Sequence, residues 1–582
     1  MADSPTRAAP DPSSLAHPDA VTAHPRPAAA WAAFAACLIA VFMQMVDTTI
    51  VNIALPDLAR DLGATSSDQL LVLTVYTLAF ACTLMAGSRL GERVGRHRMF
   101  VAALAAFTLA SVLCGTATGP AELIVLRGVQ GVSAACASAQ TIAVIATMFP
   151  RTRHPLVFGV YGATAGIAAI CGPIVGGALI SADVAGLGWR AIFLVNLPFG
   201  LIACVVAWRC LPVMRAARDV TLDLRGVALS AAGLFALIYP LAVGREKGWP
   251  AWTWASMGAA VILLVAFVVH ERALLGRGGE PLLRVDLFRS RAFAVGCVLS
   301  IAFFGVFGAF FFAMSVTAQF GLGYSALRTG LITLPFALGA AVGSVGSSLI
   351  VPRLGARTLA LGMAVFAVSV AWTAALLDPS SGALDLPPLI PALVLGGVGV
   401  GLFVAPLQAT IVSGTTEQTV GSASGMVPTV QQIGASVGLA VVGVFFFAQL
   451  AAAAPTAASQ SSDELTAALR TTSVPNQVAP FVVGSFTDCA RRQLASPRPE
   501  VSPPGCSTRD AGSGPRAEIL AAAGPAVRDA ARQAAARAFL AAFTTTLWTI
   551  AGTAAALAAA CLALRRTPTG TLSPAGPRPP AV

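Results

Sequence analysis

The sequence predicts an all-α, polytopic membrane protein with fourteen transmembrane helices. Of its 582 residues, 56% are apolar and only 11% are charged, whereas soluble globular proteins carry roughly 25% charged residues. So few charges cannot cover the surface of a water-soluble domain, which excludes a soluble enzyme, a disordered chain and a nucleic-acid-binding domain. The chain also contains repeated apolar runs of about 20 residues, the length that crosses a hydrocarbon core.

The fourteen apolar runs follow one another with short polar connections. The first run is too long for a signal-peptide core and contains Asp47, so we expect it to be retained as a membrane span. The runs cover residues 31–55, 68–88, 99–117, 121–148, 156–180, 191–211, 223–243, 252–270, 292–317, 326–350, 357–377, 388–412, 427–450 and 539–563.

The placement of arginine predicts that both termini are cytoplasmic. The Ala- and Arg-rich composition with a single lysine is typical of a GC-rich bacterial genome, so we expect a multi-pass protein of the bacterial cytoplasmic (inner) membrane. With the N-terminus inside, Lys and Arg concentrate in the cytoplasmic segments, as the positive-inside rule requires. The outer segment 451–538 carries nine arginines, but long translocated loops do not follow that rule.

Two short basic turns, at residues 93–98 and 353–358, resemble each other and suggest an internal duplication. Two related helical halves around a midplane site are a common transporter plan. We therefore expect two six-helix bundles with two helices inserted between them. The expected divisions are a cytoplasmic tail (1–30), an N-terminal bundle (31–212), two inserted helices (213–270), a cytoplasmic linker (271–291), a C-terminal bundle (292–563) containing an extracellular loop (451–538), and a second cytoplasmic tail (564–582).

Two charges stand out because they fall inside apolar runs. Asp47 is the only acid near the middle of a run, and Arg127 is the only cation that this topology places within the hydrocarbon. At 1.5 Å per residue they lie about 12 Å and about 10 Å below the outer face. Charges at that depth are usually paired or line a cavity. We favour a proton switch, with Glu122 near the membrane surface feeding protons inward; the alternative is an ion pair that only fixes helix register.

Five short motifs occur in order along the N-terminal half. They read VDTTIVNIALP (46–56), SRLGERVGRHR (88–98), LRGVQG (126–131), GPIVGG (172–177) and WRAIFLVNLPFG (189–200). In this order and spacing they resemble the signatures of the major facilitator superfamily. More narrowly, they resemble its fourteen-span drug:proton antiporter family, which includes multidrug and antibiotic exporters.

The chain departs from the pattern of this family at several positions. Glu92 replaces the more frequent Asp, Ser88 replaces a Gly, and Leu71 replaces a Trp. The tenth run contains no acidic residue, although some multidrug members use one there for divalent cations. That absence argues against dicationic substrates.

The resemblance implies two further sites. Residues 88–98, here called the gating loop, would latch the two halves on the cytoplasmic side; the alternative is that their charge only anchors topology. Gly172, Pro173, Gly176 and Gly177 would form the antiporter motif, whose small residues let helices pack closely and, by resemblance, seal the seam between the halves. The gating residues are Arg89, Glu92, Arg93, Gly95 and Arg96.

Polar and aromatic side chains within the runs are candidates for a substrate cavity, because amides and phenols avoid lipid. The candidates are Gln44, Asn52, Tyr76, Gln140, Phe307, Gln408, Gln431 and Gln432. Six phenylalanines in the second half of run 292–317 could form an aromatic wall, but they cannot all face one way, so we expect most of them to face lipid. They are Phe303, Phe304, Phe307, Phe310, Phe311 and Phe312.

The cysteines show no metal-binding spacing. Cys489 and Cys506 lie together in the outer segment, either as a disulfide on the oxidising side of the membrane or as two free thiols. No G-x-x-x-x-G-K-[ST] loop surrounds the single lysine, Lys247, and no H-E-x-x-H motif is present. An ATP-driven pump and a membrane metalloprotease are therefore disfavoured.

These observations predict a proton-driven antiporter, not an enzyme, that exports lipophilic small molecules such as drugs or antibiotics. Its partners would be the small-molecule substrate, protons and the lipid bilayer, without ATP, nucleic acid, cofactor or metal. The alternative is a symporter that imports or exchanges a small metabolite. The direction of transport rests on the family resemblance, since fold alone does not determine it.

Overall fold

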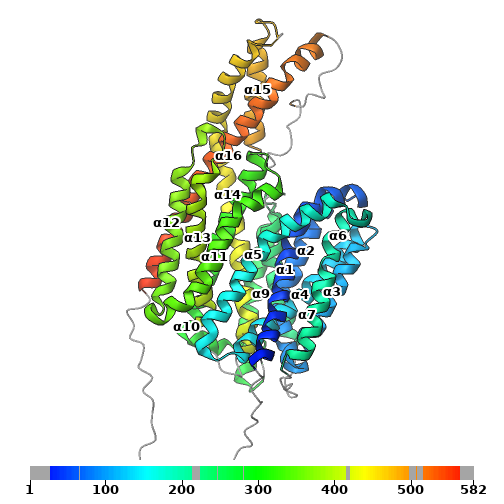
Figure 1. Ribbon diagram of the computed structural model, residues 1–582, viewed down its shortest axis with the longest axis vertical. Helices are drawn as coiled ribbons and strands as arrows, with labels where there is room; N and C mark the ends of the chain where they lie inside the picture. Colours follow the sequence, from blue (N-terminus) through cyan, green and yellow to red (C-terminus); the bar gives the residue numbers. More distant parts are fainter. Residues whose placement is uncertain are drawn as a thin grey trace, which may run out of the picture.

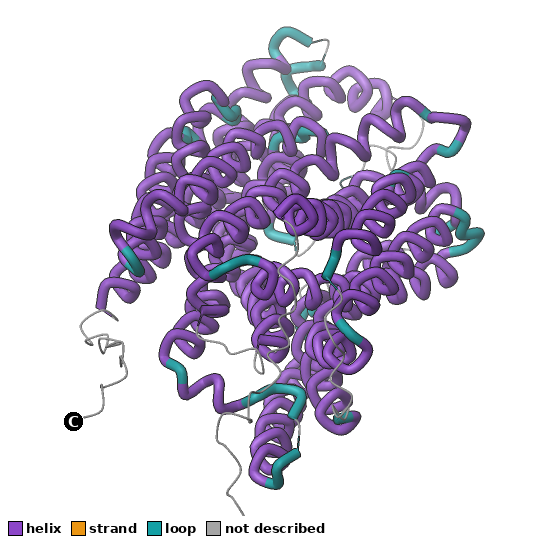
Figure 2. Tube along the Cα trace, turned by 60° about the horizontal axis from the view of Figure 1, so that its bottom comes forward, coloured by secondary structure: helices purple, strands orange, loops and turns teal. Residues whose placement is uncertain are grey.

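The computed structural model describes residues 27–64, 66–212, 223–244, 247–279, 281–413, 420–472, 474–496, 506 and 515–563. In these ranges the secondary structure is helical and includes no strand. Most helices run roughly along the long axis of the molecule and lie side by side (Figure 1), and the tube view shows how densely they are bundled (Figure 2).

Nine helices precede the middle of the chain. They are α1 (Pro27–Leu62), α2 (Ser66–Val94), α3 (Arg96–Gly115), α4 (Pro120–Met148), α5 (His154–Ala182), α6 (Ala191–Leu194), α7 (Asn196–Cys210), α8 (Leu224–Val243) and α9 (Ala251–Gly276). The remaining helices are α10 (Arg291–Val316), α11 (Ala326–Leu354), α12 (Arg357–Leu376), α13 (Leu386–Ser413), α14 (Val420–Leu469), α15 (Ala479–Leu494) and α16 (Pro515–Ala563). A short π-helix, Thr317–Gly321, follows α10.

Each predicted run coincides with one of these helices, and α6 and α7 together form the sixth. Among the described residues, thirteen helical segments are long and apolar enough to cross a membrane. The run at 156–180 lies in α5, a 29-residue helix whose apolar segment in the described part is the shorter Leu156–Ala168. The all-α, multi-pass fold is confirmed, and the count of fourteen spans stays a prediction.

Each of the two basic turns of the sequence repeat contains a glycine with a positive φ. Gly95 precedes α3 with φ of 98°, and Gly355 follows α11 with φ of 55°. Both angles lie in the region that glycine adopts without steric cost. Glycine therefore permits the tight reversal between two long apolar helices at both places.

The helices form two groups that meet along α5. Helices α1–α7 surround two clusters of buried side chains, one around Phe100, Phe107 and Phe158 and one around Ile50 and Phe193. Helices α10–α14 and α16 surround another cluster. In Figure 1 the first group lies to the right and the second to the left. Contacts of α5 with α11 and α13, and of α2 with α14, join the groups.

Helices α8 and α9 pack against each other, and α8 packs against α2 and α14. Their contact centres on Leu234, Ile238 and Phe267, which meet Leu78 and Met85 of α2. The opposite face of α9 exposes a row of large aliphatic side chains, namely Val261, Ile262, Val265 and Val269. Such a face is suited to contact with lipid, because soluble monomers rarely expose large contiguous apolar patches.

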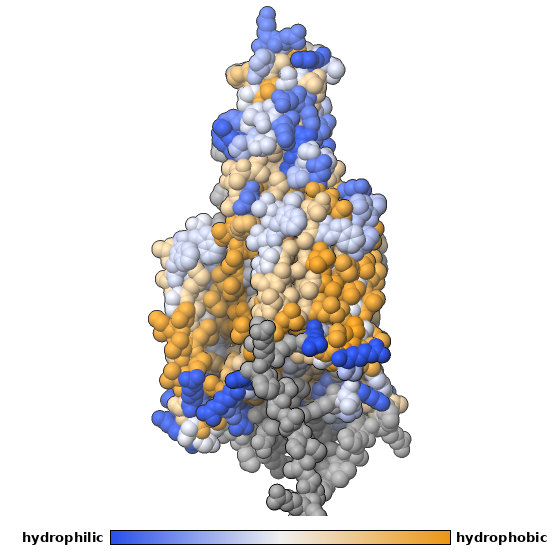
Figure 3. Space-filling view, turned by 90° about the vertical axis from the view of Figure 1, so that its left-hand side faces the viewer, coloured by the Kyte–Doolittle hydropathy of each residue, from blue (hydrophilic) through white to orange (hydrophobic). Residues whose placement is uncertain are grey.

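The surface of the molecule has the polarity of a membrane protein. On the face shown in Figure 3, apolar residues form a belt across the middle of the helices, while hydrophilic residues gather at the lower rim and on the upper projection. A hydrocarbon solvent accounts for the belt, since helices satisfy their own backbone hydrogen bonds there.

The upper projection, here called the extension, consists of the end of α14, all of α15 and the start of α16 (Figure 1). The sequence assigned this region to a loop, but most of the described part is helical. A cluster that includes Leu465, Val482 and Phe486 holds the three helices together. Arg537 of α16 donates to the Ser380 carbonyl (3.1 Å) in the α12–α13 connection and to Ser461 Oγ (3.1 Å). These bonds attach the extension to the helices below it.

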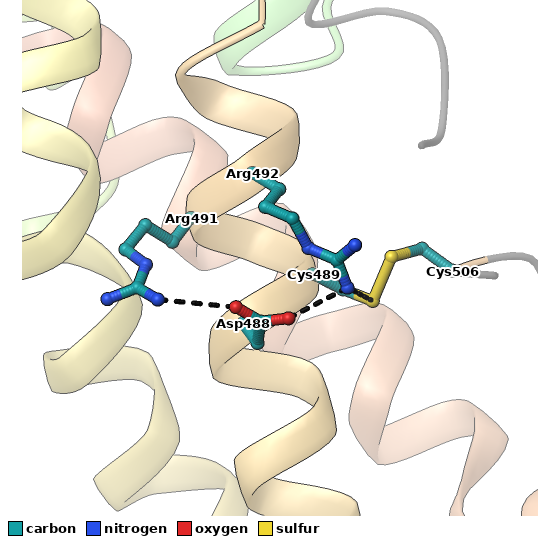
Figure 4. Close-up of a disulfide and its surroundings, with 5 residues drawn as sticks. All are labelled: Asp488, Cys489, Arg491, Arg492 and Cys506. Carbon is teal, nitrogen blue, oxygen red and sulfur yellow. Dashed lines mark hydrogen bonds and ion pairs between the residues drawn. A yellow bond between two sulfur atoms is a disulfide. The ribbon is translucent and has the colours of Figure 1, made fainter. Parts of the chain in front are cut away.

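The structure contains a disulfide between Cys489 and Cys506 (Figure 4). Cys489 lies on α15, next to Asp488, whose carboxylate pairs with Arg491 (3.2 Å) and Arg492 (2.7 Å) of the same helix. The disulfide links the end of α15 to the segment that leads into α16. It therefore adds a covalent constraint to the helix packing of the extension.

Candidate functional site

Asp47 of α1 and Arg127 of α4 form a buried ion pair. The distance from Arg127 Nη1 to Asp47 Oδ2 is 2.6 Å, and their side chains are 1% and 0% exposed, respectively. The sequence predicted that Asp47 and Arg127 lie at similar depths, and in the structure their side chains are in direct contact. Two opposite charges that leave water together avoid much of the cost that each would have alone.

Gln130 joins both members of this pair. Its amide nitrogen donates to Asp47 Oδ1 (2.9 Å), and its amide oxygen accepts from Arg127 Nη1 (2.7 Å). Gln130 follows Arg127 by three residues, so both side chains lie on the same face of α4. The amide can serve as donor to the anion and acceptor from the cation at the same time.

A second amide reaches Asp47 from α7. Asn196 Nδ2 lies 3.5 Å from Asp47 Oδ1 and donates to Ser111 Oγ of α3 at 3.0 Å. Ser111 in turn donates to the Phe193 carbonyl at 2.8 Å. The carboxylate of Asp47 therefore lies at the meeting point of α1, α3, α4 and α7.

The Arg127 guanidinium is enclosed on its remaining sides. It lies 4.4 Å from the centre of the Tyr76 ring, within cation–π range, and its Nε donates to the Val72 carbonyl at 3.4 Å. Both Tyr76 and Val72 belong to α2. In this conformation neither charge reaches solvent, so a proton can reach Asp47 only if the surrounding helices move.

Sequence reasoning gave no role to Gln130, Asn196 or Ser111. Two signals were available: Gln130 shares a helix face with Arg127, and Asn196 is an amide inside an apolar run. Ser111 gave no signal, because serine is common in membrane helices and its hydroxyl can bond to its own backbone.

The structure does not bring Glu122 into this network. Glu122 is exposed in the first turn of α4, where its carboxylate accepts from the Thr118 amide (2.9 Å) and hydroxyl (3.0 Å). This arrangement caps the helix by satisfying a free backbone donor. A role for Glu122 in proton entry stays a prediction.

An exposed polar cluster joins α1 to the start of α6 on the side of the extension. Asp61 accepts from Arg190 Nη1 (2.5 Å) and from Trp189 Nε1 (3.0 Å). The hydrogen bonds from Arg190 and Trp189 hold the pKa of the Asp61 carboxyl below its usual value. This cluster gives the WR pair of the fifth sequence motif a structural role.

The antiporter motif packs against the turn of α1 that carries Asp47. A Cβ added at Gly172 would overlap the Thr49 side chain and lie 3.0 Å from the Val46 carbonyl oxygen. A Cβ at Gly176 would lie 2.7 Å from the Ile50 side chain.

The contacts at Gly172 and Gly176 are therefore within the first group of helices, whereas Gly159, near the start of α5, faces α11 across the seam. A Cβ at Gly177 would meet no atom within 4 Å, and the side chain of Pro173 lies outside the described residues.

The gating loop is organised around Glu92. Its carboxylate pairs with Arg89 (2.6 Å) and Arg96 (3.4 Å). Arg89 also donates from Nε to the Leu282 carbonyl (3.1 Å) and from Nη2 to the Pro281 carbonyl. Arg93 is exposed, while Gly95 is buried in the turn itself. Arg89 therefore joins the gating loop to the linker between α9 and α10.

The candidate cavity residues fall into different environments. Tyr76 faces Arg127, and Gln140 donates to the Gly87 carbonyl of α2 at 2.8 Å, which makes it a link between helices. Gln432 is partly buried, and the side chain of Asn52 lies outside the described residues.

Three other candidate amides each have a buried polar atom without a partner among the described residues. They are Gln44, Gln408 and Gln431. Such atoms favour polar ligands or water.

The expectation that most of the six phenylalanines from Phe303 to Phe312 face lipid is wrong. Phe303 and Phe310 are buried, and the other four of the six are partly buried against the same cluster. Phe307 lies between Phe303 and Phe311, with ring centres 5.5 Å and 5.0 Å away. Rings on α11, α12 and α13, including Phe336, Phe366 and Phe403, receive them. The expectation failed because α10 has aromatic neighbours on several sides.

The fold and the buried charges are those of a polytopic membrane transport protein. Residues 37–439 match the Major Facilitator Superfamily. The chain is 36% identical over 516 residues to the probable actinorhodin transporter of Streptomyces coelicolor, covering 87% of this chain and 89% of that protein. It is 30% identical over 444 residues to the tetracenomycin C resistance and export protein of Streptomyces glaucescens, covering 75% and 78%. The chain belongs to the Major Facilitator Superfamily.

A solved structure supports the same fold. The human organic anion transporter MFSD10 (TETRAN) superposes with a TM-score of 0.51 at 16% identity, covering 72% of this chain and 94% of that one. At this identity the likeness concerns the fold alone.

Proposed function

We propose that this protein is a proton-driven antiporter that exports lipophilic small molecules, such as drugs or antibiotics, across the bacterial cytoplasmic membrane. The observation that carries the proton coupling is the buried Asp47–Arg127 pair with its bridging Gln130. The two relatives described above, named for actinorhodin transport and for tetracenomycin C export, support the class of substrate and the direction.

The ion pair suggests how a proton would be exchanged for substrate. Protonation of Asp47 removes its attraction for Arg127, and the guanidinium then keeps Gln130 and the Val72 carbonyl as acceptors. Loss of the proton restores the pair. Because Asp47 also faces α3 and α7, each change of charge alters the contacts among four helices.

We also propose the two-bundle division predicted from the sequence, with both termini cytoplasmic and the extension outside. Alternating access would then require the two helix groups to rock about the seam along α5. The described contacts between the groups at the end opposite the extension include Gly159 with Ser344 and Gly425 with Ser88. In the proposed orientation these contacts close the cytoplasmic side, with the gating loop beside them.

Asp47→Asn tests proton coupling in everted vesicles. An inside-acid gradient should drive accumulation of a fluorescent drug by the wild type, and Asp47→Asn should abolish it while the protein still inserts. Asp57→Asn is the matched control, because Asp57 lies on the same helix but pairs with Arg60 in a half-exposed position. Wild-type activity in Asp47→Asn would remove Asp47 from the mechanism, and solute uptake into intact cells would instead support a symporter.

A further inference from the structure

Two carboxyl groups meet at the ends of α8 and α9 that lie opposite the extension. Asp223 precedes the first residue of α8, and Glu271 lies in the penultimate turn of α9. Glu271 is 0% exposed, and the Asp223 side chain is 8% exposed. A Cβ added at Gly226 would collide with both Asp223 Oδ2 and Glu271 Oε1. The two carboxyls therefore converge on the same small space beside a glycine.

The hydrogen bonds of this pair leave one oxygen unsatisfied. Glu271 Oε2 accepts from the Leu283 amide at 2.9 Å, and Asp223 Oδ2 lies 2.8 Å from His270 Nε2. Glu271 Oε1, on the side of Asp223, has no donor among the described residues. A buried carboxylate oxygen without a donor is costly, and a second carboxylate beside it adds repulsion.

We propose that Asp223 and Glu271 hold one proton between them and form a second proton-binding site, on the inserted helices and apart from Asp47. A proton on Glu271 Oε1 turns that oxygen into a donor and removes one of two adjacent negative charges. Among the contacts that the structure describes, none joins this site directly to the ion pair of α1 and α4.

The neighbouring cations are exposed or pair with other groups and leave Glu271 without a cationic partner among the described residues. His270, partly exposed, contacts Asp223 and forms an ion pair with it when protonated, while Arg225 and Arg272 are exposed on α8 and α9. Arg284 of the linker pairs with Asp286 at 3.7 Å, and Arg89 of α2 pairs with Glu92. In the described part of the chain no ion pair joins an arginine or lysine to Glu271, so a proton is the cation that fits this space.

The site is connected to the gating loop through three consecutive linker residues. Glu271 holds the Leu283 amide, and Arg89 donates to the carbonyls of Pro281 and Leu282. Glu271 thus acts as a positioning residue for the anchor of Arg89. Loss of the shared proton leaves two carboxylates facing each other, which pushes Glu271 away from this position and weakens the anchor. This link rests on the proposed function of the gating loop, whereas the proton site does not.

Infrared spectroscopy of the purified protein in lipid nanodiscs tests the proton site. A pH titration should reveal the C=O band of a protonated carboxyl near neutral pH, and Glu271→Gln or Asp223→Asn should remove it. The band should persist in Asp47→Asn, which separates the site from the proposed coupling pair, and in Asp286→Asn, a nearby, partly exposed control. An unchanged band in both Glu271→Gln and Asp223→Asn would overturn the proposal.

The connection to the gating loop has its own readout. In everted vesicles the buffer sets the pH at the proposed cytoplasmic face, so export can be measured over a pH series at constant ΔpH. Glu271→Gln keeps an acceptor for Leu283 without a titrating group and should flatten one limb of the pH profile of the wild type. A pH profile identical to that of the wild type would refute the connection, while loss of the infrared band would still support the proton site.

Discussion

The amide of Gln130 donates to the carboxylate of Asp47 over 2.9 Å, across the contact between α4 and α1. The same side chain accepts from Arg127, so one neutral residue fixes the geometry of two buried charges. A charge-assisted bond in a water-free site is stronger than a neutral one. Gln130 therefore orients Asp47 and Arg127 relative to each other.

Replacing Gln130 by Leu should lower the rate of export. The carboxylate of Asp47 loses a donor and the Arg127 guanidinium loses an acceptor, so the geometry of the ion pair is no longer fixed by a residue that contacts both charges. A bond to a charged group contributes about 1.5 kcal/mol at the lower end, which corresponds to roughly a tenfold lower rate if the bond is needed in the transition state. The measurement is the initial rate of drug transport in vesicles, normalised to protein in the membrane. Ser133→Ala is the control, since the Ser133 hydroxyl donates to the Val129 carbonyl of its own helix, and a wild-type rate for Gln130→Leu would contradict the role of the amide.

Arg127→Lys should impair export although it keeps the positive charge. The guanidinium reaches Asp47, Gln130 and the Val72 carbonyl from fixed directions, which a flexible ammonium does not reproduce. Loss of one such bond, worth about 1.4 kcal/mol, corresponds to about a tenfold lower rate if it is needed in the transition state. Initial export rates, normalised to protein in the membrane, provide the measurement. Arg98→Lys in the exposed end of the gating loop serves as control, and a fully active Arg127→Lys would favour a merely structural ion pair.

Gly172→Ala should lower export strongly, whereas Gly177→Ala should not. The methyl group at Gly172 would displace α5 from the α1 turn that carries Asp47, while the methyl group at Gly177 would meet no atom within 4 Å. Overpacking of a close contact typically costs about 1–3 kcal/mol. Export rate and thermal stability of the two purified variants are compared directly, and equal behaviour would show that close packing at Gly172 is unimportant.

Loss of the disulfide should loosen the extension without affecting the membrane helices. Cys489 and Cys506 are 17 residues apart, a loop size for which cross-linking contributes about 3 kcal/mol. Protease added to intact spheroplasts should therefore cleave the extension faster in Cys489→Ser or after reduction. Cleavage confined to everted vesicles would contradict the proposed orientation, and unchanged cleavage would show that helix packing alone holds the extension.

Much of the fold could be predicted because each membrane span is a local property. A run of about 20 apolar residues forms a helix in lipid whatever its neighbours are, so the run at 99–117 closely matches α3. The extension could not be assigned in this way, because its Ala-, Pro- and Ser-rich composition resembles a loop. Its helices are stabilised by the cluster around Phe486 and by Arg537, and these contacts lie far apart in sequence.

The sequence by itself determined the class of the molecule and singled out its buried charges, since hydrophobicity adds along a run and an ionised group in that run is conspicuous. Tertiary structure alone decided which side chains surround those charges. It placed Asn196 and Ser111 beside Asp47, turned Gly172 toward α1 and brought Asp223 against Glu271. These contacts depend on how each helix is rotated about its axis, and that rotation is set by packing between helices rather than by the composition of any one of them.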